Sequence, residues 1–226
     1  MIITIDGPAA SGKSITAKGA AERLGFLYLD TGAMYRAVTL AFLRAGVKFD
    51  DIKAIESILD ELKLSLVADE SGSRILIGDE DVSEAIRGLN VTQNVSAVSA
   101  VFVVRKKMVQ LQREVVIGKN AVVEGRDIGT VVFPDADFKF FISANVETRA
   151  KRRQKDLEKL GIKQSVDEIV EDLKQRDRKD SSRRLSPLKK SDDARVIDTT
   201  SLTINDQINI IVNQVRLKIG KEEKNK

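Results

Sequence analysis

The sequence predicts an α/β fold with a five-stranded, mainly parallel sheet, and three observations support this prediction. Short apolar segments alternate with helical segments along the chain, which is typical of a parallel sheet covered on both faces. A glycine-rich turn joins the first apolar segment to the first helical one. One region, at residues 63 to 82, departs from the alternation and has the period of two expected of an antiparallel pair of strands.

Each predicted element has a local reason. The strands are five short apolar segments: IITI (2–5), FLYL (26–29), AVVE (121–124), FKFFIS (138–143) and RVID (195–198). Helices are expected at 13–24, about 32–45 and about 103–117, because each is followed by a glycine suited to a helix C-terminus, namely Gly25, Gly46 and Gly118. A further helix should begin at Ser165, where SVDE matches the capping box.

The irregular region predicts a small antiparallel insert. Leu62, Leu64 and Leu66 fall on one face of a strand, an ESGS turn follows at residues 70–73, and Ile75 and Ile77 repeat the period of two. This region is therefore predicted to be a small antiparallel insert that breaks the alternation of strands and helices.

Composition narrows the possible chemistry. With 226 residues and 42% hydrophobic content, the chain can bury a sizeable core. It has no cysteine and no histidine, so disulfides, thiol nucleophiles and imidazole bases are excluded, and catalysis must rest on carboxylates, cationic side chains, hydroxyls and backbone amides. The start, MIITIDG, has no basic leader and soon reaches Gly7, so we expect a cytoplasmic protein with no membrane association.

The net charge of +4 is unevenly distributed. Residues 149–190 hold 15 Lys or Arg against 8 Asp or Glu, a balance of +7, and the remainder holds 23 against 26, a balance of −3. Such a stretch is either a solvated helical face or a surface for phosphates. Charge alone does not choose between a nucleotide and a nucleic acid.

The segment GPAASGKS, residues 7–14, matches the P-loop pattern G-x-x-x-x-G-K-[ST] between a predicted strand and a predicted helix. Glycines let the backbone turn around phosphate, Lys13 reaches the outer phosphates, and the Ser14 hydroxyl suits magnesium. The sequence therefore predicts binding of ATP with Mg²⁺. The expected ATP-binding residues are Gly7, Pro8, Ala9, Ala10, Ser11, Gly12, Lys13, Ser14 and Ile15.

Two further segments place charged side chains at the carboxyl ends of predicted strands, where open parallel sheets bind ligands. LDTGAMYR, residues 29–36, ends in Arg36, and helix capping by Asp30 or Thr31 would not explain that arginine. AVVEGRDIGTVVFPDA, residues 121–136, places Glu124, Arg126 and Asp127 directly after a buried strand. The three charged residues of the second segment could pair with one another, bind a metal or bind a substrate, and the segment by itself is compatible with all three roles.

These segments, together with RDRKDSSRRLSPL at 176–188, resemble the bacterial cytidylate kinases in the same order and at similar intervals. The resemblance implies a P-loop three-layer fold: a core of residues 1–30, 119–147 and 185–226, a nucleoside monophosphate-binding domain at 31–118 with the antiparallel insert at about 62–88, and a helical lid at 148–184. It also implies transfer of the γ-phosphoryl group of ATP to CMP or dCMP with Mg²⁺, by a monomer that binds these nucleotides and no nucleic acid.

The resemblance assigns substrate-binding roles residue by residue. It implies that the acceptor phosphate is held by Arg36, Arg126 and Arg183, the cytosine ring by Ser96, Arg105 and Asp127, and the sugar by Arg176 and Asp180, with Thr31 and Tyr35 also at the acceptor site. Thr31 stands where better-known members carry a serine, which keeps the hydroxyl. Ser96 and Arg105 would point to opposite faces of one continuous helix, so the chain should break between them, and the run VFVV at 101–104 is the candidate break.

Catalysis should rest on positioning and charge neutralisation, since the phosphate dianion of the acceptor needs no base. The expected catalytic residues are Lys13, Arg126, Arg149, Arg153 and Arg183. Which lid arginines reach the transferring phosphoryl group stays open, and Arg152, Arg178 and Arg184 are expected to be solvated surface residues. Glu124 would either organise magnesium and water or restrain Arg126.

Other functions fit the sequence less well. A GTPase switch should carry a guanine-reading segment similar to N-K-x-D, which the chain lacks. A nucleic-acid-binding ATPase would use residues 149–190, but that region has no aromatic residue for base stacking and is rich in acids. The nearest alternative is a P-loop kinase for UMP, another monophosphate or a small alcohol.

Overall fold

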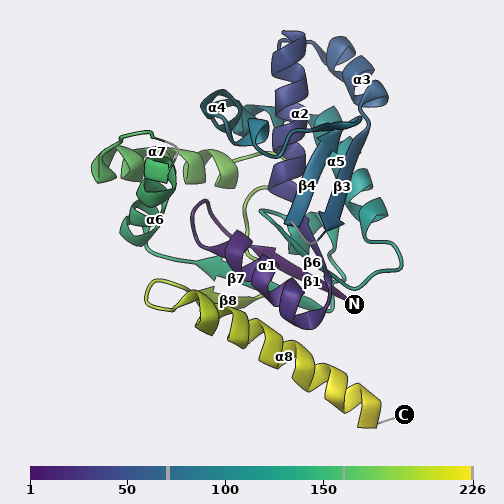
Figure 1. Cartoon of the computed structure of the whole chain (residues 1–226), viewed down its shortest axis with the longest axis vertical. Helices are drawn as coiled ribbons and strands as arrows, with labels where there is room; N and C mark the ends of the chain where they lie inside the picture. The colour runs from purple at the N-terminus through teal and green to yellow at the C-terminus, as the bar shows by residue number, and fades with distance from the viewer. Residues whose placement is uncertain (70–71, 160, 225–226) are drawn as a thin grey trace. The chain divides into compact units, whose positions relative to one another are not determined.

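The computed structural model describes residues 1–69, 72–159 and 161–224 (Figure 1). The chain forms two compact units. We call Met1–Leu29 together with Gly118–Lys226 the sheet unit, and Asp30–Ile117 the inserted unit, because the second interrupts the first in the sequence. No helix in the described ranges is both long enough and apolar enough to cross a lipid bilayer.

A five-stranded sheet is the centre of the sheet unit, as predicted. Its strands lie in the order β2-β6-β1-β7-β8, and β1 pairs in parallel with β6 and with β7, as β7 does with β8. The bounds are β1 Ile2–Asp6, β2 Leu27–Asp30, β6 Ala121–Gly125, β7 Phe138–Ser143 and β8 Arg195–Asp198. All five strands therefore lie within about one residue of the apolar segments that predicted them.

The register of β1 and β6 brings two functional segments to one edge of the sheet. Ile5 pairs with Glu124, and Asp6 pairs with Gly125. The loop that follows Asp6 and the loop that follows Gly125 therefore leave the sheet side by side. The second loop continues into η2, a short π-helix at Ile128–Val132, which no pattern in the chain predicted.

Helices α1 (Lys13–Leu24) and α8 (Ile204–Lys224) pack together on one face of this sheet. Their shared core includes Ile3, Ile5, Ala17, Ala20, Ala21, Val122, Phe140, Ile142, Ile208, Ile211, Val212 and Val215. A Cβ atom at Gly19 would crowd the end of the Ile208 side chain, so glycine at this position lets α8 pack closely against α1. The predicted helix at 13–24 is confirmed, with Gly25 in the left-handed conformation at its end.

Helices α6 (Val146–Lys159) and α7 (Val166–Ser181) pack against each other around a small apolar cluster. This cluster contains Ala9 of the P-loop with Ala150, Leu157, Ile169 and Leu173. The predicted capping box is present: the Ser165 side chain accepts from the amide of Glu168, and the Glu168 carboxylate accepts from the amide of Ser165. The helix pair is thus tied through its apolar core to the P-loop.

The inserted unit contains α2 (Thr31–Ala45), α3 (Ile52–Glu61), α4 (Leu89–Val98), α5 (Phe102–Val115), the short 3₁₀ turn η1 (Ala85–Arg87) and a three-stranded sheet. That sheet is antiparallel, in the order β3-β4-β5, with β3 Leu64–Asp69, β4 Gly72–Ile77 and β5 Glu80–Asp81. The predicted antiparallel insert is confirmed, although Glu70 and Ser71 of its turn lie outside the described residues.

The chain does break between Ser96 and Arg105, as their spacing required. Helix α4 ends at Val98 and α5 begins at Phe102. The run VFVV is not the break, however, because its last three residues belong to α5, where Val104 is fully buried. The interruption is the turn at 99–101, in which the amide of Ala100 bonds to the Ala97 carbonyl at 3.0 Å. Burial of an apolar face outweighs the low helix propensity of valine here.

Candidate active site

The P-loop has the backbone conformation that its sequence predicts. Ala10 (φ 57°) and Gly12 (φ 95°) are left-handed, and alternation of this kind turns successive amides toward one centre, where an anion can bind. A Cβ atom at Gly7 would lie 2.1 Å from the Ile142 carbonyl oxygen, so the loop passes too close to β7 for any other residue. Lys13 is 8% exposed, and its Nζ donates to the Pro8 carbonyl at 3.2 Å.

Glu124 lies at the end of β6 and is 2% exposed. One carboxylate oxygen accepts from the Ser14 hydroxyl at 2.9 Å, and the other accepts from the Tyr28 hydroxyl at 2.6 Å. The carboxylate therefore fixes the P-loop hydroxyl that was predicted to face magnesium. Whether Glu124 organises magnesium or restrains Arg126 stays a prediction.

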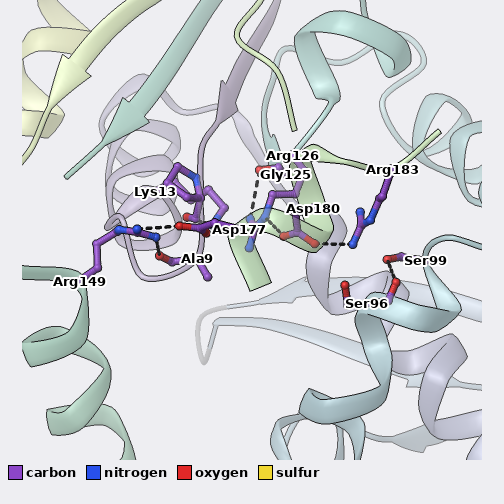
Figure 2. Close-up of polar contacts among 11 residues, drawn as sticks. Ala9, Lys13, Ser96, Ser99, Gly125, Arg126, Arg149, Asp177, Asp180 and Arg183 are labelled. Atoms are coloured by element: carbon purple, nitrogen blue, oxygen red, sulfur yellow. Dashed lines mark hydrogen bonds and ion pairs between the residues drawn. The ribbon is translucent and has the colours of Figure 1, made fainter. Parts of the chain in front are cut away.

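Asp180 joins two of the predicted phosphate-binding arginines (Figure 2). Its side chain is 3% exposed; one oxygen accepts from Nε of Arg126 at 3.0 Å and the other accepts from Nη2 of Arg183. Burial by itself would raise the pKa of Asp180, but the charges of Arg126, Arg183 and Arg176 outweigh it and hold the pKa below its usual value. The Asp180 carboxylate thus holds Arg126 and Arg183 in one cluster, with Arg176 near enough to help lower its pKa.

The arginines of α6 differ from one another. Arg149 donates to the Ala9 carbonyl of the P-loop at 3.2 Å and to the Asp177 carboxylate of α7 at 2.7 Å (Figure 2). Arg153 is half-buried and forms no ion pair with any residue in the described ranges. Arg149 therefore ties α6 and α7 to the P-loop, and Arg153 has the charge that remains available for an anion.

Arg152 is not the solvated surface residue that was expected. Its guanidinium donates to the Ser11 carbonyl at 3.0 Å, to the Thr199 hydroxyl at 3.1 Å and to the Thr199 carbonyl at 2.7 Å. Burial lowers the pKa of Arg152 from its usual value. The expectation was wrong because helical spacing does not indicate which neighbouring arginine meets the P-loop. The expectation fits for Arg178, whose ion pair with Glu171 is exposed, and for Arg184, which is exposed.

Asp6 ends β1, and Asp127 lies in the loop between the neighbouring strand β6 and η2. Asp127 is 4% exposed and is followed by η2. Asp6 is equally buried, and its two oxygens accept from the amides of Ile128 at 2.9 Å and Gly129 at 2.8 Å. Burial raises the pKa of Asp6 to about 6, against the lowering effect of those two amides.

In the inserted unit, the predicted residues lie at two helix starts. Asp30 caps α2 by accepting from the amide of Ala33 at 2.8 Å, and its other oxygen accepts from Arg36 at 3.1 Å. A Cβ atom at residue 32 would lie 3.0 Å from that carboxylate, so Gly32 permits the close pair. Thr31 is 2% exposed at the first position of α2.

Arg105, near the start of α5, is 5% exposed. Its guanidinium donates to the Ser99 carbonyl at 3.0 Å and stacks over the Tyr35 ring at 5.6 Å from the centroid. Ser96 lies in the last turn of α4, where its carbonyl accepts from the Ser99 hydroxyl (Figure 2). The turn at 99–101 thus joins the segments that carry these two predicted base-reading residues.

Sequence reasoning missed four residues that hold this arrangement together: Asp6, Tyr28, Arg152 and Asp177. Asp6 and Tyr28 had one available signal, a polar side chain within an otherwise apolar strand segment. Arg152 and Asp177 had none, because each lies among several similar charged residues on its helix. Their partners are distant in the sequence, so only the fold selects them.

Comparison with known proteins identifies the family. The pattern that defines the family described as Cytidylate kinase matches residues 3–217. The cytidylate kinase of Halalkalibacterium halodurans is 45% identical over 97% of this chain and 99% of its own length. That of Chlorobaculum tepidum is 47% identical over 95% of this chain and 92% of its own.

A solved structure agrees at the level of fold. An uncharacterized protein from Eubacterium ventriosum superposes with a TM-score of 0.52 at 15% identity, covering 96% of this chain and 98% of that one. Similarity at this identity supports the α/β architecture alone. The sequence matches are far stronger and extend over nearly the whole chain. The chain therefore belongs to the cytidylate kinase family.

Proposed function

We propose that this enzyme transfers the γ-phosphoryl group of ATP to CMP or dCMP, giving ADP and CDP or dCDP. The observation that carries the proposal is the cluster in which Asp180 holds Arg126 and Arg183 within the unit that also contains the P-loop. Planar guanidinium groups suit a phosphate dianion. Because β1 and β6 pair in register, Arg126 leaves the sheet beside the P-loop.

We propose acceptor-binding roles for residues of each unit, taken separately. In the sheet unit, Arg126 and Arg183 would bind its phosphate, Asp127 the exocyclic amine of cytosine, and Arg176 with Asp180 the sugar. In the inserted unit, Arg36 would bind the phosphate, Ser96 and Arg105 the ring, and Thr31 and Tyr35 would complete the contacts. The burial of Asp127 and Arg105 supports a role in reading a base, since polar groups discriminate best where water is excluded.

Magnesium fits the residues present beside the P-loop. The Ser14 hydroxyl and the Glu124 carboxylate, 2.9 Å apart, are the hard oxygen donors that Mg²⁺ prefers. Ser14 would bind the ion together with ATP phosphates, and Glu124 would do so through water. When bound, Mg²⁺ would neutralise charge on the phosphoryl oxygens.

The residues of the chain would act by positioning and by charge. Lys13 would bind the β- and γ-phosphates, and the P-loop amides would orient them for in-line attack. Arg149, bonded to the Ala9 carbonyl, would hold the lid helices to this loop, and Arg153 would stabilise charge on the transferring group. The acceptor phosphate is already a dianion at neutral pH, so no base is required. We propose that the enzyme works as a monomer.

A coupled assay tests the proposal directly. ATP with Mg²⁺ is offered with each of CMP, dCMP, UMP, AMP and GMP, and ADP formation is measured. We expect rapid turnover with CMP and dCMP and little with the purine nucleotides. Rapid turnover of UMP or AMP with none of CMP or dCMP would contradict the proposal.

A further inference from the structure

We infer that Asp6 is a positioning residue for the acceptor nucleotide, acting through the backbone of the loop that carries Arg126 and Asp127. The inference rests on the proposed function, because it assigns these two side chains to CMP. Asp6 is the last residue of β1 and directly precedes the P-loop, so it would be expected to serve the donor nucleotide. Its contacts point instead to the neighbouring loop.

The carboxylate of Asp6 holds the start of η2 with both oxygens. Oδ1 accepts from the amide of Ile128 at 2.9 Å, and Oδ2 accepts from the amide of Gly129 at 2.8 Å. The first amides of a helical turn have no carbonyl partner within it. Asp6 supplies that partner from a strand more than 120 positions away in the sequence, and it does so for two consecutive residues.

The segment between β6 and η2 is thereby fixed at both ends. Gly125 is the last residue of β6 that pairs with β1, and its partner in the ladder is Asp6 itself. Ile128 is the first residue held by the Asp6 side chain. Only two residues lie between these fixed points, and they are Arg126 and Asp127. Asp6 therefore fixes the backbone positions from which the Arg126 and Asp127 side chains extend.

Close packing supports the same interpretation. A Cβ atom at Gly129 would lie 2.9 Å from the Thr4 hydroxyl and 3.4 Å from Oδ2 of Asp6. The backbone at this point therefore lies directly against β1, and a larger residue would push it away. Without a side chain at Gly129, the loop backbone can lie beside Thr4, where the Gly129 amide reaches Asp6.

The contacts of Asp6 are with the backbone of this loop. Its side chain is buried, and both of its oxygens accept from backbone amides. It forms no salt bridge with any residue in the described part of the chain, and burying a carboxylate without a cationic partner costs stability. A carboxylate retained in such a place is explained by the geometry it imposes on the loop.

Asp6→Asn is the informative variant, because it keeps the size of the side chain and replaces one acceptor oxygen by an NH₂ group that faces a backbone N–H. Asp137→Asn is the matched control: Asp137 accepts from the amide of Ile2 at 2.7 Å, at the opposite end of the same strand. Binding of CMP and of a non-hydrolysable ATP analogue is measured by calorimetry for the full chain. We expect Asp6→Asn to weaken CMP binding about 10-fold and ATP-analogue binding less than about 2-fold. The control should change neither by more than about 2-fold.

Amide hydrogen exchange supplies a readout that does not depend on activity. In Asp6→Asn, exchange should become faster at residues 126–132 and stay unchanged in the P-loop. Equal weakening of CMP and ATP-analogue binding, or unchanged CMP binding, would overturn the inference. Failure of the unmodified chain to bind CMP at all would overturn the proposed function, and this inference with it.

A second pair of variants covers the case in which Asp6→Asn does not fold. Gly129→Ala crowds Thr4 and should also weaken CMP binding selectively. Adding Thr4→Ala removes the crowding atom and should restore most of that binding. Loss of CMP binding that the double variant does not restore would count against the role of this contact.

Discussion

The predicted site residues of the two units are held in different ways. In the sheet unit, the contacts join residues far apart in the sequence: 110 positions for Ser14 and Glu124, 54 for Arg126 and Asp180, and 140 for Arg149 and Ala9. In the inserted unit, Arg36 bonds to Asp30 and Arg105 bonds to Ser99, each pair six positions apart.

This difference has an energetic meaning. A short-range contact at a helix start can form wherever that helix forms, so losing it should affect ligand binding more than folding. A long-range contact exists only in the folded unit, and when it is buried its loss leaves a charge without its partner. Substitutions in the sheet unit should therefore combine functional and stability effects, and those in the inserted unit should separate them.

Lys13→Ala should have the largest effect. Removal of one preorganised donor from a phosphoryl-transfer site typically lowers kcat by roughly 10²- to 10³-fold, and Lys13 is a buried cation of the P-loop. We expect kcat to fall by about 10³-fold in the coupled assay. CMP binding measured by calorimetry should stay within about 2-fold, and an equal loss of CMP binding would contradict the separation of donor and acceptor roles.

Asp180→Asn tests the long-range class. The variant leaves Arg126 and Arg183 without their shared carboxylate, so the free energy of unfolding should fall by about 2 kcal/mol. This loss is smaller than for a fully buried pair, because Arg126 is partly exposed. Urea denaturation measures this, and KM for CMP should also rise about 10-fold or more. An unchanged urea midpoint would show that the cluster has no structural role.

Arg36→Gln tests the short-range class. We expect KM for CMP to rise about 30-fold through loss of a charge-assisted contact with the phosphate. The free energy of unfolding should change by less than about 1 kcal/mol, because the pair with Asp30 is partly exposed. A stability loss as large as that of Asp180→Asn would break the comparison between the units.

Glu124→Gln refines the role of the P-loop hydroxyl. The amide keeps the shape but removes a charged acceptor from Ser14 and Tyr28, so kcat should fall about 10-fold. A titration of activity with MgCl₂ should show a higher requirement for Mg²⁺. If the Mg²⁺ requirement does not change while kcat falls, Glu124 acts on the loop alone.

The smallest effect is on the pH dependence of stability. The pKa of Asp6 is raised from 3.8 to about 6 in the folded chain. Between these two pH values the folded state binds more protons than the unfolded state. The stability that this group contributes is therefore lost as the pH rises through that window. Relative to Asp6→Asn, the unmodified chain should lose about 1 kcal/mol between about pH 5 and about pH 7. For Asp180, whose pKa is lowered, the sign is opposite and stability is lost on acidification.

How far the sequence predicted the structure follows the same division. The strands, the helix at 13–24, the capping box at Ser165 and the antiparallel insert depend on neighbouring residues, and all were predicted correctly. A break between Ser96 and Arg105 was expected because the resemblance assigns both side chains to one ring, which one continuous helix would not allow. Its exact place was not predicted correctly, because packing of Val104 decides which residues join α5.

The contacts of the site were less accessible. Arg149, Arg152 and Arg153 lie within five positions on one helix. No local pattern distinguishes Arg152, which meets the Ser11 carbonyl, from Arg153, which forms no ion pair with the residues that the structure describes. The π-helix η2 depends on Asp6, which lies in another strand. Residue roles toward CMP came from the resemblance to cytidylate kinases, and they stay predictions.

The chain contains two tyrosines and no tryptophan, so its intrinsic fluorescence comes from Tyr28 and Tyr35 alone. Tyr28 donates to Glu124 beside the P-loop hydroxyl, and Tyr35 lies under the Arg105 guanidinium in the inserted unit. The molecule therefore carries one natural fluorophore at each of its two proposed nucleotide sites. With the Tyr28→Phe and Tyr35→Phe variants, the order in which ATP and CMP bind could be followed in real time without attaching any label.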